Sequence, residues 1–220
     1  MNRNRKSTRP CLNASGFTII ELMLAMTVFS LVLVAASVGL IQIGRMYYRG
    51  VITTRTQDNT RLVIDEISRS IQFTGGDILF SNNPDEDHRA VCIGSTRYSY
   101  VINQQLLNDT PHVLWRDQPN DLSSCNPVDL LSSDLENGTE LAGENMRLSR
   151  FSVEKRDNEY VIRVGLVYGD YDLLVGVRAD GEYVDYDDDS AERIICGIGA
   201  STQFCAVSNL ETVVISRLSR

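Results

Sequence analysis

The stretch Ser15-Gly16-Phe17-Thr18-Ile19-Ile20-Glu21-Leu22, followed by an uncharged apolar run to Gly44, decides how this chain is organised. As an α-helix, residues 22–44 would be about 35 Å long, which is enough to cross the hydrocarbon core of a bilayer. The segment upstream is short, polar and basic, and the segment downstream has the composition of a soluble domain. The sequence therefore predicts a membrane-spanning helix that carries a domain on its carboxyl side.

The leader before this run, residues 1–16, contains no acidic residue and four cations, namely Arg3, Arg5, Lys6 and Arg9. The leader has no apolar run, so it cannot be the hydrophobic core of a secretory signal. A secretory signal built on the following apolar run would need a shorter core and a small-residue cleavage site. Ala35-Ala36-Ser37 matches such a site poorly, because the apolar pattern continues through Ile43.

The net charge of −8 is unevenly distributed, because the leader is basic and the rest of the chain is acidic. Without the four leader cations, 17 basic residues stand against 29 acidic ones, so residues 17–220 carry −12. Such an acidic body argues against direct binding of nucleic acid, which requires a basic face. The acidic body also favours a position outside the cytoplasm, although Arg45, Arg49 and Arg55 reduce the positive-inside bias.

Four of the five cysteines lie in the predicted extracytoplasmic part, and Cys11 lies in the leader. An oxidising compartment permits two disulfides, and four cysteines allow three pairings. The pairs Cys92–Cys125 and Cys196–Cys205 are favoured because each brackets a plausible strand-loop unit without entangling the other. Free buried thiols stay open as an alternative, whereas the lack of a C-x-x-C pair argues against zinc.

Glu21 places a carboxylate at the entrance of an apolar segment, where burial in lipid would be unfavourable. Cleavage after Gly16 would create an amine on Phe17, four residues from Glu21 and on the same helix face. The positive amino end of the helix would also favour the acid. An ammonium from this chain or a neighbour would turn the carboxylate into an assembly contact. The alternative is an interfacial glutamate that reaches the lipid headgroups.

The run Gly16-Phe17-Thr18-Ile19-Ile20-Glu21-Leu22-Met23 closely resembles the type III signal of type IV prepilins and type II secretion pseudopilins. The resemblance implies that prepilin peptidase cuts between Gly16 and Phe17 and methylates the new amine of Phe17. It also implies that Glu21 pairs with the terminal amine of a neighbouring subunit during filament assembly. The implied partners are the peptidase, other pilins or pseudopilins, the membrane and the inner-membrane assembly platform.

The size of the head, the late cysteine pairs and the order of segments resemble larger minor pilins of the pilin-tip group, called W-type or J-type. This resemblance implies a single-pass inner-membrane protein with a periplasmic head, which later enters a pilus or a pseudopilus and can reach the cell surface. Glu21 argues against the specialised tip pseudopilin that lacks this acid. A type II secretion pseudopilin is the alternative within the family.

Four segments follow from these patterns: a leader over 1–16 that is removed, a transmembrane and assembly helix over 17–44, an amphipathic helix over 45–76 and an extracytoplasmic head over 77–220. Val63, Ile67 and Ile71 recur every four residues and predict a helix stripe that is buried in the head. Residues 53–60 are polar all round and predict a solvent-facing or subunit-contacting stretch. Gly75-Gly76 is expected to end the helix.

The remaining pattern predicts β-strands and therefore an α+β, pilin-like fold, with an antiparallel sheet packed on the carboxyl half of the helix. Apolar residues recur at every second position over residues 160–168, namely Tyr160, Ile162, Val164, Leu166 and Tyr168, and residues 148–153 alternate except at Ser149-Arg150. These two stretches form a hairpin through a turn at 156–159. Further strands are expected at 90–93, 98–102, 113–116, 173–178 and 207–218.

No catalytic pattern is present: the sequence lacks G-x-S-x-G, a Walker loop and H-E-x-x-H. His88 and His112 are the only imidazole bases, and the acids around His88 lack the spacing of metal ligands. Asp185, Asp187 and Asp189 alternate as calcium ligands do, but Ser190 and Cys196 stand where a calcium loop needs glycine and an acid. The sequence therefore predicts a structural protein without a cofactor; the alternative class is a membrane-anchored extracytoplasmic enzyme or binding protein.

Overall fold

The structure is a computed structural model that describes residues 16–74, 78–81, 88–106, 111–119, 125–132, 135–157, 159–186, 188, 190–197 and 202–217. The chain separates into two compact units, Met1–Gly44 and Arg45–Arg220. Of the predicted leader, only Gly16 lies among the described residues. The glycine pair expected to end the helix, Gly75-Gly76, lies outside them.

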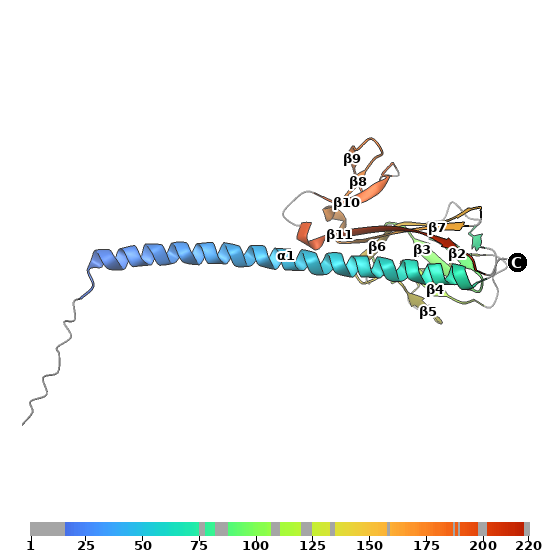
Figure 1. The fold of residues 1–220 in the computed structure, drawn as a ribbon, viewed down its shortest axis with the longest axis horizontal. Helices are drawn as coiled ribbons and strands as arrows, with labels where there is room; N and C mark the ends of the chain where they lie inside the picture. The colour runs from blue at the N-terminus through green and yellow to red at the C-terminus, as the bar shows by residue number, and fades with distance from the viewer. Residues whose placement is uncertain are drawn as a thin grey trace, which may run out of the picture. The chain divides into compact units, whose positions relative to one another are not determined.

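One long helix, α1, runs from Ile19 to Phe73 and contains no proline (Figure 1). In the first unit its apolar side chains are exposed, and the helix is long and apolar enough to cross a membrane. Its three hydroxyl side chains in this part each donate a hydrogen bond of 2.8 Å to a carbonyl of the preceding turn: Thr27 to Leu24, Ser30 to Met26 and Ser37 to Leu33. These hydroxyls are therefore satisfied without water, as a lipid environment requires.

In the second unit, one stripe of α1 is buried in the head. The predicted stripe of Val63, Ile67 and Ile71 is confirmed, since each side chain is at most 2% exposed. The expectation that residues 53–60 face solvent or other subunits is wrong for Thr56 and Thr60, which are fully buried. Their hydroxyls donate to the carbonyls of Ile52 and Thr56, at 2.9 and 2.7 Å, so the methyl groups can pack without leaving an unpaired donor.

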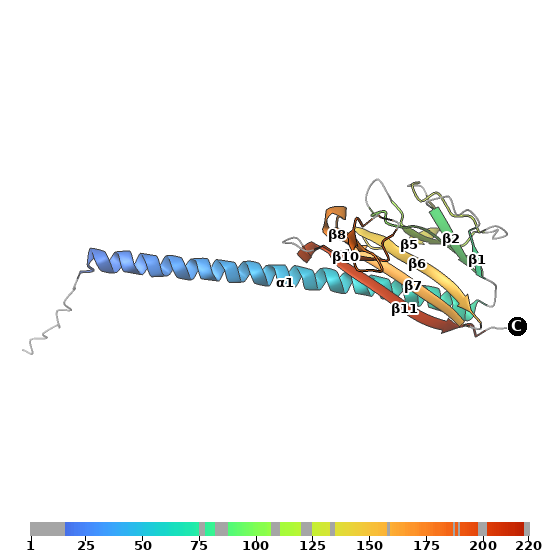
Figure 2. The same ribbon diagram turned by 90° about the horizontal axis from the view of Figure 1, so that it is seen from above.

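The strands are all antiparallel and form three sheets within the described residues (Figures 1 and 2). The largest sheet has the order β1-β2-β3-β4-β5, with bounds Ile78–Phe80, His88–Ile93, Thr96–Val101, Leu114–Asp117 and Gly138–Glu140. A second sheet has the order β11-β7-β6, with bounds Ala206–Ile215, Glu159–Tyr168 and Met146–Arg156. The smallest has the order β10-β8-β9, with bounds Arg193–Cys196, Leu174–Val177 and Tyr183–Val184, and 3₁₀ turns lie at Tyr171–Leu173 and Thr202–Phe204.

The β6–β7 hairpin explains the broken alternation at Ser149-Arg150. The pairing register shifts between Leu148 and Arg150, which is a β-bulge that inserts one extra residue into β6. The bulge lets Leu148 and Phe151 both reach the core, although three positions separate them. Strict alternation would have sent one of the two to the opposite face.

A single core joins α1 to both larger sheets, and its α1 members are Val63, Ile64, Ile67 and Ile71. The strands contribute fully buried side chains such as Tyr98 on β3, Leu148 on β6 and Ile162 on β7. An ion pair between Glu66 of α1 and Arg116 of β4, with an O–N distance of 2.5 Å, adds a polar contact. The α+β, pilin-like architecture predicted from the sequence is therefore confirmed, with the antiparallel β-structure divided among three sheets.

Tyr98 supplies a testable link between α1 and β3. Its side chain is fully buried, and its hydroxyl lies 2.6 Å from the Ser70 hydroxyl. Burial is the main cause that raises the pKa of Tyr98 to about 12. The unfolded tyrosine titrates near 10, so its contribution to stability is complete below pH 10 and is lost as pH rises through 12.

We expect the free energy of unfolding to fall by roughly 2 kcal/mol between pH 10 and pH 12 through Tyr98 alone, because the proton is lost more easily in the unfolded chain. Tyr98→Phe should remove this part of the alkaline slope, because phenylalanine has no proton to lose. Chemical denaturation followed by circular dichroism between pH 8 and pH 12 measures both slopes. Tyr183→Phe, at an exposed position, should keep the wild-type slope. If the free energy of unfolding falls equally steeply with pH in Tyr98→Phe and in wild type, the raised pKa of Tyr98 is not its cause.

Candidate functional site

Gly16 and Phe17 precede the first residue of α1 and lie in exposed, non-helical chain. A Cβ built on Gly16 would meet nothing within 4 Å, and the Phe17 side chain is 83% exposed. The packing of the described residues therefore does not require a glycine at position 16. A requirement for glycine at this position would have to come from a partner that approaches the backbone.

Thr18 and Glu21 form a reciprocal capping box at the start of α1. The Thr18 backbone N–H and hydroxyl donate to Glu21 Oε2, at 3.0 and 2.9 Å, and the Glu21 N–H lies 3.3 Å from Thr18 Oγ1. These bonds satisfy donors that a helix amino terminus leaves unpaired. The sequence signal for this cap is a threonine three residues before a glutamate at the start of an apolar run.

The capping box gives the Glu21 carboxylate partners within its own chain, which reduces the penalty of placing it beside an apolar segment. A capping residue contributes about 1 kcal/mol to a helix. The carboxylate also lies at the end of the helix dipole that attracts negative charge. Glu21 is therefore held in a defined place at the helix entrance, and its lone pairs can accept further hydrogen bonds.

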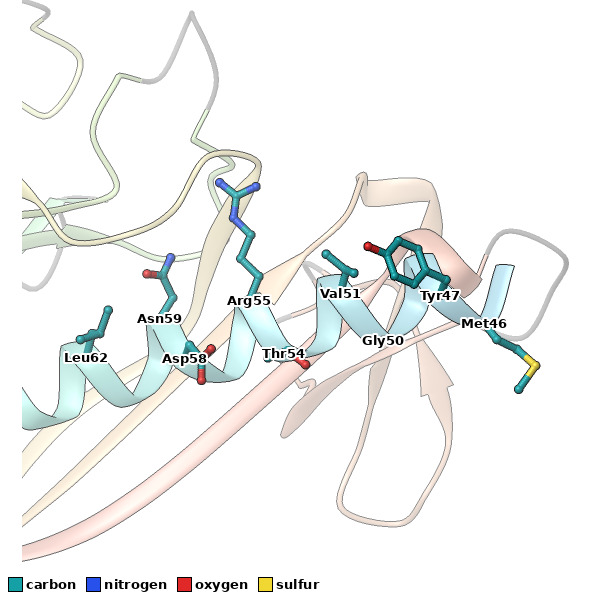
Figure 3. A pocket seen from close by; sticks show the side chains of 9 residues that line it. All are labelled: Met46, Tyr47, Gly50, Val51, Thr54, Arg55, Asp58, Asn59 and Leu62. Carbon is teal, nitrogen blue, oxygen red and sulfur yellow. The ribbon is translucent and has the colours of Figure 1, made fainter. Parts of the chain in front are cut away.

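The second unit carries an exposed hollow on α1, with a volume of about 660 Å³ (Figure 3). All of its lining residues come from α1: Met46, Tyr47, Gly50, Val51, Thr54, Arg55, Asp58, Asn59 and Leu62. Met46, Tyr47 and Leu62 are between 66% and 74% exposed, so this face combines large apolar side chains with charged ones. Arg55 lies 3.9 Å from Glu144, and both side chains are exposed, so this ion pair adds little stability.

The disulfides join Cys92 to Cys125 and Cys196 to Cys205, with Cα–Cα distances of 5.9 and 5.8 Å. These are the pairs favoured from the sequence. The first attaches β2 to the chain near Asn126, and the second attaches the end of β10 to the residue before β11. Cys11 lies outside the described residues.

Loss of the disulfides should lower stability unequally, because the closed loops differ in length. The cysteine positions are 33 apart in the first pair and 9 apart in the second. In the chain-entropy account, the longer loop contributes about 4 kcal/mol and the shorter about 3 kcal/mol. We therefore expect a Cys92→Ser/Cys125→Ser variant to be less stable than Cys196→Ser/Cys205→Ser in denaturant titrations under matched conditions. The opposite order would contradict this account.

His112, considered as an imidazole base, lies in a structural contact. Its ring is 4.3 Å from the Trp115 ring between centroids, and Nδ1 is 3.5 Å from Glu140 Oε2. The Glu140 carboxylate accepts the backbone N–H groups of Val113, Leu114 and Ala142, at 3.0, 3.0 and 2.8 Å. The carboxylate thus ties β5 to the start of β4. The sequence had no signal for this contact, because 28 positions separate the histidine from the glutamate.

The acidic segment considered for calcium is described only in part, because Asp187 and Asp189 lie outside the described residues. Asp188 accepts hydrogen bonds from the Ser190 backbone and hydroxyl and lies 3.6 Å from Arg178. These Ser190 hydrogen bonds are the main cause that lowers the pKa of Asp188. Among the described residues, no group of three or more histidine, cysteine or acidic side chains could hold a metal ion.

Comparison with known proteins adds one match at the amino terminus. Residues 11–37 match the family model described as the prokaryotic N-terminal methylation motif. No curated protein and no solved structure matches the chain. The match includes Gly16, Phe17 and Glu21 and ends within the apolar part of α1. The chain therefore carries a prokaryotic N-terminal methylation motif, which supports the resemblance of its amino terminus to type IV prepilins and pseudopilins.

Proposed function

We propose that this chain is a minor pilin, a structural subunit of a type IV pilus that is assembled through its amino-terminal helix. The observation that carries the proposal is the methylation motif over residues 11–37, which begins before Gly16 and continues into α1. The motif favours a structural protein over an enzyme. The pilin-like α+β head supports the same reading.

In this proposal, prepilin peptidase removes residues 1–16 and methylates the new amine of Phe17. The exposed chain around Gly16 and Phe17 suits access by an enzyme, because no side chain of the described residues lies near Gly16. The helix that follows holds the mature chain in the inner membrane, and the head lies in the periplasm. The two disulfides of the head suit an oxidising compartment.

Assembly would proceed through α1, with residues 17–44 as the transmembrane part and residues 45–76 as the amphipathic part that enters the head of residues 77–220. Glu21 would pair with the methylated amine of a neighbouring pilin. An ammonium placed beside this carboxylate replaces a lipid-facing charge with an ion pair. Other pilins, the peptidase and the inner-membrane assembly platform are the partners of the proposal.

Mass spectrometry of the chain recovered from the membrane fraction tests the processing step. The expected mature chain begins at Phe17 and carries one additional methyl group on its amine. A chain that retains residue 1, or that is cut near Ala36, would contradict the proposal and favour a membrane-anchored enzyme or binding protein.

A type II secretion pseudopilin is the second candidate, because the same motif occurs in both kinds of subunit. The two differ in the filament that incorporates the chain. Mass spectrometry of sheared surface filaments should find the chain together with pilins. Its absence there, combined with a processed chain in the envelope and a secretion defect on deletion, would favour the pseudopilin.

A further inference from the structure

A polar cleft lies between the outer face of the sheet β11-β7-β6 and the small sheet β10-β8-β9. Its volume is about 380 Å³. Ser149 and Arg150 of the β6 bulge and Asn209 of β11 line one side, and Tyr186 and Arg193 line the other. In both views of the ribbon, the small sheet lies near one end of β6 and β11 (Figures 1 and 2).

The floor of the cleft depends on Gly165 of β7. Gly165 pairs with Arg150 on one side and with Asn209 on the other. A Cβ at this position would lie 2.4 Å from Asn209 Oδ1 and 2.5 Å from Ser149 Oγ. The missing side chain therefore leaves space in which these two polar groups lie over the strand. A glycine inside a strand and a bulge beside it commonly mark a place where another group approaches the backbone.

The wall opposite the floor is held in place by three separate contacts. A second apolar cluster packs Leu174 and Ile194 of the small sheet against Val167 of β7. The Cys196–Cys205 disulfide ties the end of β10 to the residue before β11. The Arg147 guanidinium, in a residue only 2% exposed, lies 5.2 Å from the centre of the Tyr186 ring. The cleft is therefore formed before any ligand arrives, as binding sites usually are.

The chemistry of the lining selects the class of ligand. Arg150 and Arg193 carry only hydrogen-bond donors, whereas Asp188 and Glu192 carry only acceptors. The formal charges of these four lining side chains cancel, and Asp188 also lies 3.6 Å from Arg178, which does not line the cleft. Amide groups, which both donate and accept, complete the lining at Asn103 and Asn209. Asn103 Oδ1 is buried and has no hydrogen-bond partner among the described residues.

We propose that this cleft binds a neutral carbohydrate. A sugar hydroxyl both donates and accepts, so neighbouring hydroxyls can satisfy both the guanidinium groups and the carboxylate groups that line the cleft. Tyr186 adds aromatic area to the lining, beside the polar groups, for the C–H groups of a sugar ring. The volume suits one or two sugar rings, and the position on the head leaves α1 free for assembly.

The test uses the full chain in a detergent without a sugar headgroup and does not depend on filament assembly. Saturation-transfer NMR is recorded with maltose, cellobiose, lactose and N,N′-diacetylchitobiose, and with the zwitterion glycylglycine as a charged probe. We expect at least one disaccharide to bind, with an affinity that is the same at low and high salt. Failure of all four disaccharides to bind would overturn the proposal, as would salt-dependent binding of glycylglycine alone.

Two variants locate the binding. Gly165→Ala should displace the Ser149 and Asn209 side chains from the floor, and Arg193→Ala removes donors from an exposed side chain. Arg193→Ala should weaken disaccharide binding by about tenfold or more, since hydrogen bonds to charged groups contribute that much. Gly165→Ala should weaken it by about fivefold or more, since it displaces two neutral hydrogen-bonding groups. Arg156→Ala, at an exposed position at the end of β6 distant from the bulge, should leave binding unchanged. Wild-type affinity in Arg193→Ala and Gly165→Ala would overturn the assignment to this cleft.

Discussion

A Glu21→Gln variant should enter the membrane and be cut normally, yet be largely missing from sheared filaments. Glutamine keeps a side-chain oxygen that can accept the Thr18 N–H, so the helix cap survives. It cannot pair with an ammonium, and removing one partner of a buried ion pair costs about 3–5 kcal/mol. We therefore expect incorporation to fall at least about a hundredfold. Quantitative mass spectrometry of filament and membrane fractions gives the ratio.

A matched variant separates capping from pairing. Thr18→Val removes the hydroxyl that donates to Glu21 and accepts from its N–H, but leaves the carboxylate charged. Its incorporation should stay close to wild type, because the lost cap is worth only about 1 kcal/mol. If Glu21→Gln is incorporated normally while Thr18→Val is not, Glu21 acts as a helix cap and the pairing account is wrong.

A Gly16→Val variant should accumulate as an uncut precursor. The β-branched side chain would block the close approach of the peptidase to the backbone. The change should not disturb the described part of the chain, because a Cβ at Gly16 meets none of its atoms within 4 Å. The mass of the amino-terminal peptide from membrane preparations distinguishes the precursor from a chain that begins at Phe17.

Thr18→Val again serves as the control for this prediction, since it changes a residue two positions from Gly16 and should be cut as in wild type. Both variants should insert into the membrane to the same extent, because the apolar segment is unchanged. Normal cleavage of Gly16→Val would contradict our account of the site. Failure of Thr18→Val to be cut would instead place part of the recognition in the threonine hydroxyl.

The parts of the fold that depend on local periodicity were predictable from the sequence. Val63, Ile67 and Ile71 repeat at helix spacing, and the apolar residues at every second position over 160–168 lie on β7. The burial of Thr56 and Thr60 was not predictable from polarity, because each hydroxyl bonds to its own helix backbone. The division of the strands into three sheets depends on pairings between distant segments, for which alternation carries no information.

The two candidate sites also differ in whether they are formed by contiguous residues or by residues from distant segments. The motif around Gly16 and Glu21 is contiguous, so the sequence alone identified it, although the cap from Thr18 was overlooked. The polar cleft draws Asn103, Ser149, Arg193 and Asn209 from segments far apart in the chain. Only the broken alternation at Ser149-Arg150 pointed to an irregularity there, and nothing in it indicated which segments would meet.

The hydroxyls of Thr27, Ser30 and Ser37 each donate to a carbonyl of their own helix, so these hydrogen bonds do not depend on whether lipid or protein surrounds the helix. A filament subunit must leave lipid and enter a bundle of neighbouring helices. Because each hydroxyl keeps the same carbonyl acceptor in lipid and in the bundle, none has to exchange its hydrogen-bond partner during the transfer. Glu21 is the only charged side chain between Gly16 and Gly44. On the proposed function, the transfer of the helix from lipid to the filament therefore depends mainly on apolar packing and on the ion pair between the Glu21 carboxylate and the amine of a neighbouring subunit.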